Sequence, residues 1–256
     1  MKRFCLTIDD NIRFLKELSE QERDSLFDHP YLAMLRRLHE RFGAKIQLNL
    51  FYRMEGFDLA DMSGGYAAEW AENADWLKLS FHSEWENERP YETAGYDEVR
   101  SHCRAVHEQI LRFAGPASLG ETTTLHYCRT TDEGLRALSD SGVRGLLGLF
   151  GSDESPKTSY GLSQDEASAA RAGCLVSAKG MSFAGIDMVV NTVSLSDVVP
   201  QLSERLGRER VCVMIHEQYF YEDYAAYQPD YEQKLTVALE LLCRSGYEGR
   251  FFEELI

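Results

Sequence analysis

Phe4-Cys5-Leu6-Thr7-Ile8 is followed directly by Asp9-Asp10, so two adjacent carboxylates stand behind a short run of strand-forming residues. This pattern predicts a buried strand that ends at the rim of a sheet. Ionised groups at such a place cost free energy unless they contact a metal ion, a hydrogen-bond donor or a substrate. Because α/β folds build active sites at the carboxyl ends of parallel strands, both carboxylates are candidate site residues. The alternative is that they only cap a helix over residues 11–18.

The size and charge of the chain limit the classes of protein it can be. With 256 residues, 44% of them hydrophobic, and no Pro/Ser-rich linker, it is predicted to form a single domain over residues 1–256. The formal net charge of −15 argues against a nucleic-acid partner, because affinity for phosphates comes from clustered Lys and Arg. The apolar run behind Met1-Lys2-Arg3 is too short for a secretory leader, and no segment has the roughly 20 apolar residues of a membrane span. We therefore expect a soluble, cytoplasmic protein with no membrane partner.

The six cysteines lie far apart and include no CxxC pair, which fits neither a zinc finger nor a disulfide framework. Most are predicted to be buried free thiols in a reducing compartment. Cys128 is open to a second interpretation as a nucleophilic thiolate, because it follows His126 at a predicted strand end.

Predicted strands alternate with predicted helices along the chain, as in repeated βα units. The strand candidates cover residues 3–8, 45–51, 76–81, 122–126, 144–150, 186–192 and 209–215, with a short further candidate at 250–252. This pattern favours a parallel barrel over an open sheet. The predicted fold class is therefore α/β, a single distorted (β/α)7-type barrel with parallel strands. Long rim loops are expected at residues 53–65 and 151–185, the second with a small hairpin.

Polar side chains stand at the ends of the predicted strands and would meet at one rim of the barrel. They are Asp9, Asp10, Asn49, His82, His126, His216 and Glu217. The three histidines in this set each follow a run of strand length, although a structural role remains the alternative for each. The other four histidines lie on or beside predicted helices and are interpreted as structural: His29, His39, His102 and His107.

Carboxylate and imidazole together suit a divalent metal ion held by three protein ligands with an open position for water. Zinc is the first choice, with manganese, cobalt or nickel as alternatives. Asp10 and His82 are the first two predicted ligands. The third is either His126 or Glu86, which lies four residues after His82 and would share its face of a helical turn. Glu86 also belongs to the acidic stretch 84–88, so a solvated charge is its alternative reading.

The order of these motifs resembles that of the NodB-homology polysaccharide deacetylases of carbohydrate esterase family 4. Thr7-Ile8-Asp9-Asp10-Asn11 is similar to the family's T-F-D-D-G motif, and His82-Ser83 opens its H-(S/T)-x-x-H motif. Val213-Met214-Ile215-His216 matches its late hydrophobic-x-H pattern. The chain departs from the family at Asn11, at Glu86 in place of the second metal-binding histidine, and in having no R-P-P-Y-G segment.

The resemblance implies a distorted (β/α)7 barrel and a metal-dependent deacetylase acting on an amide. Asp9 would be the general base, Asp10 and His82 metal ligands, and His216 the general acid. The expected reaction removes an acetyl group from an N-acetylated sugar or related small polar substrate by metal-activated water. The expected partner is therefore a small molecule or an oligosaccharide.

Two other functions remain open. One is a catalytically degenerate barrel that binds a carbohydrate-like ligand without turnover, and the other is a different metal-dependent hydrolysis, or an isomerisation, of a small polar metabolite. Aromatic residues near the rim are candidates to stack on a sugar ring or to pack on the core: Phe51, Tyr52, Trp85, Tyr219, Phe220 and Tyr221.

Overall fold

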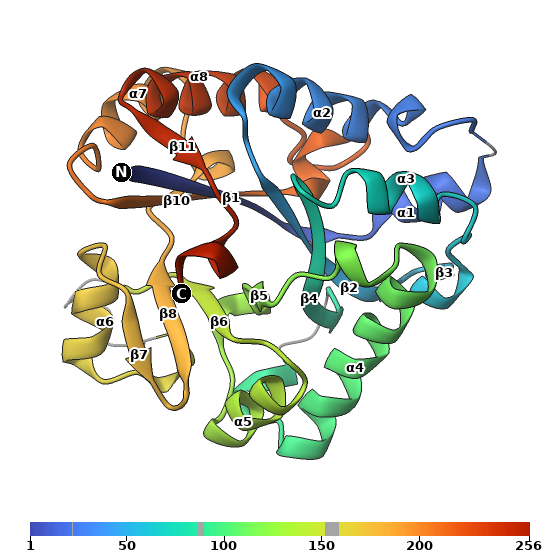
Figure 1. The fold of residues 1–256 in the computed structure, drawn as a ribbon, viewed down its shortest axis with the longest axis horizontal. Coiled ribbons are helices and arrows are strands. Elements are labelled where there is room, and N and C mark those ends of the chain that lie inside the picture. The colour runs from blue at the N-terminus through green and yellow to red at the C-terminus, as the bar shows by residue number, and fades with distance from the viewer. Residues whose placement is uncertain (22, 87–89, 152–158) are drawn as a thin grey trace.

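Parallel strands form the wall of a barrel and helices cover its outside (Figure 1). The structure, a computed structural model, describes residues 1–21, 23–86, 90–151 and 159–256. In order around the wall the strands are β9 (Met188–Val189), β10 (Arg210–His216), β1 (Lys2–Asn11), β2 (Ile46–Met54), β4 (Leu77–Trp85), β5 (Thr122–Thr123), β6 (Gly145–Gly148) and β8 (Met181–Gly185). The predicted α/β fold class, a distorted parallel barrel of the (β/α)7 type, is confirmed.

Two hydrogen-bonded sheets make up this wall. The first runs from β9 to β4 and the second from β5 to β8, and every pair of neighbours on these two paths is parallel. One seam is closed by the chain itself, because β8 leads into β9, where Asp187 N donates to Cys212 O at 2.8 Å. At the other seam Gly120 N donates to Leu79 O of β4 at 2.9 Å, just before β5 begins. These two irregular seams are what distort the barrel.

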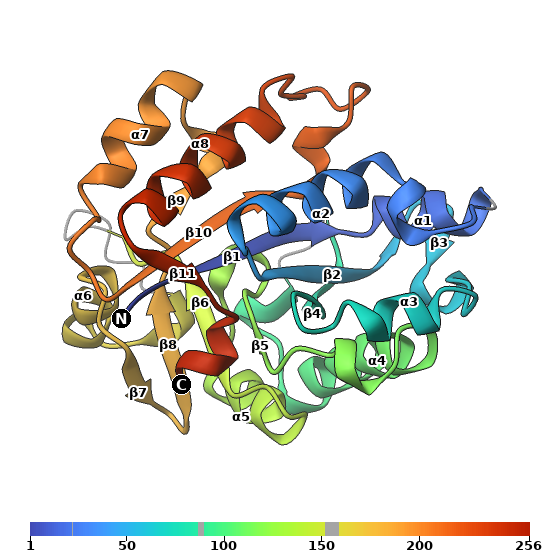
Figure 2. The ribbon, with the colours of Figure 1, turned by 45° about the horizontal axis from the view of Figure 1, so that its top comes forward.

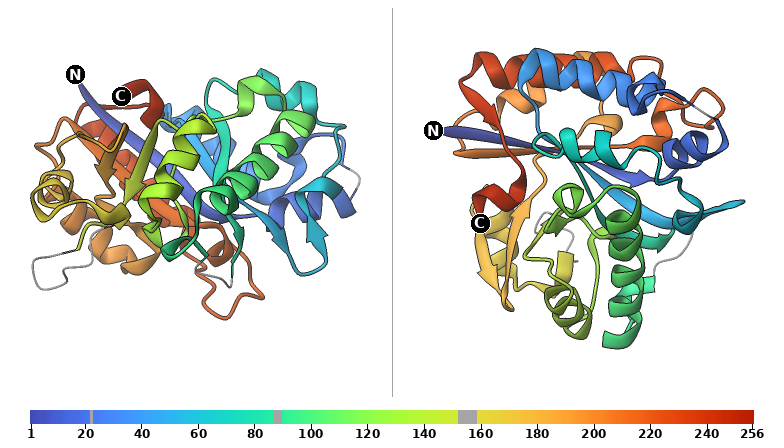
Figure 3. Two further views of the ribbon diagram at one scale, coloured as in Figure 1. Left: turned by 90° about the horizontal axis from the view of Figure 1, so that it is seen from below. Right: turned by 45° about the vertical axis from the view of Figure 1, so that its right-hand side comes forward.

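Short strands extend the wall. β3 (Phe57–Asp58) and β7 (Val176–Ala178) lie antiparallel to β2 and β8, and β11 (Tyr247–Gly249) pairs with the first residues of β1. Both ends of the chain therefore lie on the same side of the molecule (Figure 3).

The helices follow from apolar stripes that face the strands. They are α1 (Arg13–Glu20), α2 (Pro30–Phe42), α3 (Ala67–Glu72), α4 (Tyr96–Phe113), α5 (Asp132–Asp140), α6 (Gln164–Arg171), α7 (Leu195–Ser203) and α8 (Tyr231–Arg244). In α4, for example, Val99, Cys103 and Val106 are buried at helical spacing. Helices α2, α7 and α8 lie on one side of β1 and β10, while α4 and α5 pack together on the other side (Figure 2). Among the described residues, no helix is both long enough and apolar enough to cross a membrane.

Strand β8 was not expected, because residues 151–185 were predicted to be a rim loop. The small hairpin predicted in this stretch corresponds to β7 and β8, but the pairing of β8 with β6 in the barrel wall was not predicted. The chain is rich in small residues here for a packing reason: a Cβ on Gly185 would lie 2.6 Å from Ala170 O of α6. Close contact with α6 therefore excludes a large side chain at Gly185, while Met181 and Phe183 remain as the large buried residues of β8. Residues 152–158 of the predicted loop lie outside the described residues.

Three other predicted strands are shorter or shifted. The candidate at 186–192 is strand only in β9 and continues as the 3-10 helix η7 (Val190–Thr192), and the candidate at 122–126 ends at Thr123. The candidate at 250–252 lies just after β11. Hydrophobic runs thus located these strands, but neighbouring chain segments set their ends.

Candidate metal centre and active site

The end of β1 places both of its carboxylates in one cavity, although neighbours on a strand normally face opposite sides. Asp10 has φ +61°, and the pairing of β1 with β2 shifts register between Ile8 and Asn11. This irregularity interrupts the alternation of side chains, so Asp9 and Asp10 both line the cavity. Neither caps α1, whose first N–H groups are bound by Glu217 instead. The helix-cap interpretation of this pair is therefore wrong.

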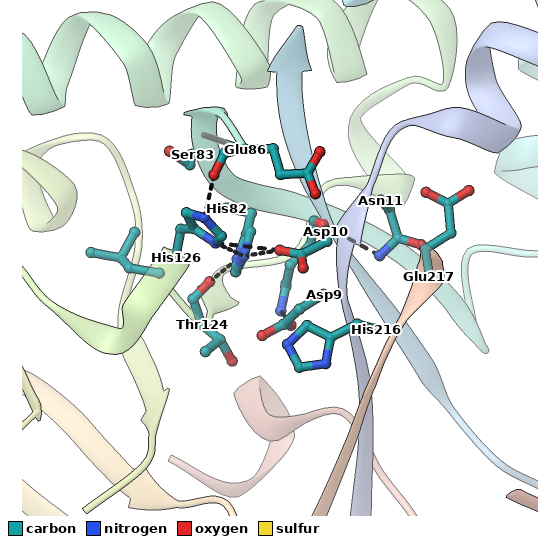
Figure 4. A network of polar contacts seen from close by, with 12 residues as sticks. Asp9, Asp10, Asn11, His82, Ser83, Glu86, Thr124, His126, His216 and Glu217 are labelled. Carbon is teal, nitrogen blue, oxygen red and sulfur yellow. Dashed lines mark hydrogen bonds and ion pairs between the residues drawn. The ribbon is translucent and has the colours of Figure 1, made fainter. Parts of the chain in front are cut away.

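Two strands and a short helix bring the ligating atoms of three side chains together above the barrel (Figure 4). Asp10 Oδ1 lies 3.0 Å from His82 Nε2 and 3.3 Å from His126 Nδ1. The two ring nitrogens are 3.2 Å apart. His82 comes from β4, and His126 opens the short 3-10 helix η5 (His126–Cys128) that follows β5. The described residues thus contain an Asp-His-His group that could hold a divalent metal ion.

Both imidazole rings are held by backbone carbonyls on their far side. His82 Nδ1 lies 2.5 Å from Thr124 O, and His126 Nε2 lies 2.7 Å from Glu86 O. A carbonyl oxygen only accepts hydrogen bonds, so in neutral rings these two nitrogens carry the protons. His82 Nε2 and His126 Nδ1 then direct lone pairs toward Asp10 and toward each other. Such an arrangement offers three acceptor atoms to one cation, either a proton or a metal ion.

The spacing of the three atoms agrees with a small transition-metal ion. Zinc bound at about 2.0–2.1 Å in a tetrahedron separates its ligand atoms by about 3.3 Å. The measured separations of 3.0, 3.2 and 3.3 Å lie close to that value. One carboxylate oxygen with two imidazole nitrogens is also a donor set that zinc, cobalt and nickel accept. The residues present therefore fit the implied metal.

The charges of the group support the same conclusion. Burial alone would raise the pKa of Asp10, but hydrogen bonds from His126 and His82 and the positive charge of His82 hold it well below its usual value. Burial would lower the pKa of His82, but the charge of Asp9 and the hydrogen bond to Asp10 raise it. The site therefore stabilises an ionised carboxylate and positive charge beside it.

Glu86 lies near this group without being part of it. Its backbone oxygen accepts the hydrogen bond from His126, while its carboxylate lines the cavity outside the three converging atoms. Burial and the neighbouring charge of Asp10 raise the pKa of Glu86. Of the two candidates for the third ligand, the geometry favours His126.

Asp9 and His216 stand opposite each other in the register of β1 and β10, next to the Asp-His-His group (Figure 4). Burial raises the pKa of Asp9, against the charges of His82 and His216 and a hydrogen bond from Asn49 Nδ2 at 2.6 Å. His216 Nδ1 lies 2.9 Å from Asn191 Oδ1. An amide oxygen only accepts, so Nδ1 carries a proton and Nε2 is the nitrogen left to exchange one.

The cavity above these groups has a volume of about 440 Å³. Aromatic and apolar side chains complete its wall: Tyr127, Leu149, Met214, Tyr219 and Tyr224. Of the rim aromatics expected to stack on a ligand, only Tyr219 lines the cavity, while Phe51 is buried against the rings of His82 and His126. Tyr127 and Tyr224 were not foreseen, because they lie in irregular segments where no periodic pattern marks them. Asn191 was missed although it lies near the end of the strand candidate at 186–192.

The remaining sequence candidates lie elsewhere or are inert. Burial raises the pKa of Cys128 to about 12, so its sulfur is a neutral thiol and the nucleophile interpretation is not supported. The four histidines assigned structural roles do not line the cavity: His29, His39, His102 and His107.

Glu217 ties the end of β10 to the start of α1. Its carboxylate accepts hydrogen bonds from Ile12 N at 2.7 Å, Arg13 N at 3.1 Å and Phe14 N at 2.8 Å. The Tyr221 hydroxyl donates a fourth at 2.7 Å. Burial raises the pKa of Glu217 to about 7, and the four donors act in the opposite direction. This buried carboxylate fixes the connection from β1 to α1, directly after Asp9 and Asp10.

Glu217→Ala is expected to destabilise the protein by about 3 kcal/mol, because it leaves buried N–H and O–H donors unpaired at a helix N-terminus. Urea unfolding followed by circular dichroism measures the change. Glu222→Ala is the matched control, since that side chain is exposed in the same loop. Ordinary surface substitutions change the free energy of unfolding by no more than about 0.5 kcal/mol. If Glu217→Ala also stays within that range, the four hydrogen bonds to Glu217 are dispensable for stability.

No family model matches the chain, and no curated protein matches its sequence. Solved structures do match it in fold. A family 4 acetyl xylan esterase from Clostridium thermocellum, solved with a cobalt ion, has a TM-score of 0.55 at 13% identity, covering 99% of this chain and 90% of that one. The Bc1960 peptidoglycan N-acetylglucosamine deacetylase has a TM-score of 0.55 at 10% identity, covering 99% and 87%.

Two further matches have other activities or none. A CE4 family pseudoenzyme from Bacillus anthracis has a TM-score of 0.55 at 11% identity, covering 99% of this chain and 65% of that one. A 4-alpha-glucanotransferase from Thermococcus litoralis has a TM-score of 0.60 at 12% identity, covering 99% and 40%. Together the matches show that the chain has the NodB-like fold of carbohydrate esterase family 4, which confirms the resemblance at the level of the fold.

Proposed function

We propose that this chain is a metal-dependent hydrolase that removes an acetyl group from an N-acetylated sugar or a related small polar substrate. The observation that carries the proposal is the convergence of Asp10, His82 and His126 on one point, with both rings oriented by backbone carbonyls. The neighbouring pair of Asp9 and His216 adds a base and an acid on the same rim. A CE4-type fold supports the same chemistry by analogy.

Asp10, His82 and His126 would hold the ion, which we propose to be zinc, with manganese, cobalt or nickel as alternatives. When bound, a divalent ion supplies Lewis acidity that makes water a stronger nucleophile and polarises an amide carbonyl. Glu86 would stand beside the ion as part of the cavity wall rather than as a ligand.

Asp9 and His216 would handle the protons. Asp9 accepts the proton of the attacking water, whose oxygen bonds to the acetyl carbon. His216 in its protonated form then donates a proton from Nε2 to the departing nitrogen, while Asn191 holds Nδ1. The C–N bond breaks, and the products are acetate and a free amine, so no covalent intermediate with the protein is needed.

The walls of the cavity suit a sugar ring. Tyr127, Tyr219 and Tyr224 line it together with the residues of the Asp-His-His group. Aromatic rings stack on the apolar face of a sugar, and phenol groups bind its hydroxyls. We accordingly propose a small molecule or an oligosaccharide as the substrate, in a cytoplasmic setting.

Acetate release from N-acetylglucosamine and its β-1,4-linked oligomers tests the proposal. The metal-loaded protein is expected to release acetate and free amine in equal amounts, and to lose this activity on chelation and regain it when metal is returned. O-acetylated xylan serves as the comparison substrate. Acetate released only from the ester would redirect the proposal to an esterase, and none from any amide by folded, metal-loaded protein would contradict it.

A second candidate function is a degenerate barrel that binds a carbohydrate-like ligand without turnover. It is favoured by the replacement of the second motif histidine by Glu86 and by the missing R-P-P-Y-G segment. Isothermal titration of N-acetylglucosamine oligomers into metal-loaded protein separates the two candidates. Saturable binding without acetate release supports the degenerate barrel.

A further inference from the structure

A chain of buried amide groups runs through the interior of the barrel to Asp9. Gln47 and Asn49 are two residues apart on β2 and so face the same side, into the barrel, where both are at most 2% exposed. Thr122 of β5 lies beside them and is 1% exposed. Barrel interiors are normally filled by branched apolar residues, and buried polar groups cost free energy unless they are paired. A polar core at this level of the barrel therefore calls for a specific role.

Three hydrogen bonds in series lead from Thr122 to Asp9, and a fourth, back to the Thr122 backbone, orients the Gln47 amide. Gln47 Nε2 donates to the backbone oxygen of Thr122 at 2.9 Å, which fixes the orientation of the Gln47 amide because a carbonyl only accepts. Its oxygen then accepts from Thr122 Oγ1 at 3.0 Å. Gln47 Nε2 also donates to Asn49 Oδ1 at 2.9 Å, which in turn leaves Asn49 Nδ2 to donate to Asp9 Oδ1 at 2.6 Å.

We infer that Gln47 and Asn49 are positioning residues for Asp9, and that this one-way donor chain holds one carboxylate oxygen while the other faces the cavity. The inference rests on the proposed role of Asp9 as the base. Hydrogen bonds aligned in series polarise one another, so each donor strengthens the next. These hydrogen bonds direct a donor at the Asp9 carboxylate without placing a further charged group in the barrel.

Without this series of hydrogen bonds, the Asp9 carboxylate would lose the orientation that its proposed role as a base requires. If Gln47 were apolar, Asn49 Oδ1 would lose its donor, and the Asn49 amide would be anchored only through Asp9, so its position would no longer be fixed by the barrel. Asp9 would then rotate away from the water that it must deprotonate. Misplacement of a reacting group by about 1 Å can cost about 100-fold in rate without weakening substrate binding.

Steady-state kinetics on the N-acetylated substrate test the inference. Asn49→Leu is expected to lower kcat about 100-fold and Gln47→Met about 10-fold, with KM and metal content unchanged. Ser80→Ala is the matched control, because Ser80 is a buried polar residue of β4 whose hydroxyl has no partner among the described residues. It removes a polar group from the same barrel and should leave kcat near wild type.

A double-mutant cycle separates positioning from mere structural support. If Asn49 acts through Asp9, adding Asn49→Leu to Asp9→Asn causes no further loss of kcat. Further loss in the double variant, or full kcat in the two single variants, would overturn the inference while leaving the proposed function in place.

Nuclear magnetic resonance tests the series of hydrogen bonds without a measurement of turnover, and the spectrum of each variant also shows whether it is folded. The side-chain amide signals of Asn49 should shift in Gln47→Met, and those of Gln47 should shift in Asp9→Asn. Unchanged signals in both variants would show that the groups are not linked. If the wild-type protein shows no turnover but the variants shift the amide signals as expected, the proposed function is contradicted and the series of hydrogen bonds is kept.

Discussion

His82→Ala is expected to empty the metal site and to abolish turnover. His82 is 2% exposed, and its Nε2 is one of three converging ligand atoms. The variant leaves only Asp10 and His126, and an open two-ligand site holds a divalent ion far more weakly than a three-ligand site. Metal content should fall from about one ion per chain to less than about a tenth of that. Inductively coupled plasma mass spectrometry on untagged protein measures it after incubation with zinc, manganese, cobalt or nickel.

His102→Ala is the matched control for this experiment. His102 lies on α4 and pairs with Glu84 at 2.9 Å, outside the cavity. Its replacement removes an imidazole and should leave the metal content unchanged. A His82→Ala variant that keeps its metal would show that the ligand set is wrong. Wild-type protein that stays empty with all four metals would contradict the metallohydrolase and favour the degenerate binding barrel.

Asp9→Asn is expected to lower kcat about 1,000-fold while the metal stays bound. The asparagine keeps the size of the side chain but cannot take a proton from water, and general bases contribute about 10²–10⁴-fold to such reactions. The metal should remain because Asp9 is not one of the three converging groups. Acetate release and metal content are measured on the same preparation, so the two effects are separated.

Asp223→Asn provides the control for the loss of a carboxylate. Asp223 is 69% exposed and pairs with Arg13 at 2.6 Å. Its conversion to the amide should leave kcat within about 2-fold of wild type, as for surface changes away from the site. If Asp9→Asn keeps full activity on every substrate turned over by wild type, Asp9 is not the base. If it loses both activity and metal, Asp9 is instead part of the metal site.

The sequence indicated the strands that carry an apolar run or an alternation of apolar residues. The run from Phe4 to Ile8 and the run from Val211 to Ile215 pair side by side in the barrel, as their composition suggests. Strand β8 buries Met181 and Phe183, but close contact with α6 requires glycine at its last position, Gly185, so its apolar pattern is too short to stand out. The pattern of apolar residues in a sequence indicates which segments are buried. It does not indicate where a neighbouring helix, such as α6, limits the size of a residue in a strand.

The candidate site was predictable only in part for a similar reason. Strand ends identified Asp10, His82 and His126, which the structure brings together, and the choice between His126 and Glu86 could not be made from spacing. A four-residue separation would place His82 and Glu86 on one face of a helix, but His82 lies within β4. Asn191 stands near the end of the strand candidate at 186–192 and was missed, and its contact with His216 is apparent only from the pairing of β9 with β10. The single domain over residues 1–256 stays a prediction.

The parallel pairing of β1 with β10 has a consequence for how the protein is made. Residues Arg3 to Asp9 lie beside Arg210 to His216, about 200 residues later along the chain. At a synthesis rate of about 5–20 residues per second, β1 waits about 10–40 s for this partner. During that time one edge of an apolar strand is open to association with other chains. The proposed base and acid, Asp9 and His216, can therefore meet only late in translation, so this protein should depend on chaperones more than its stability alone would suggest.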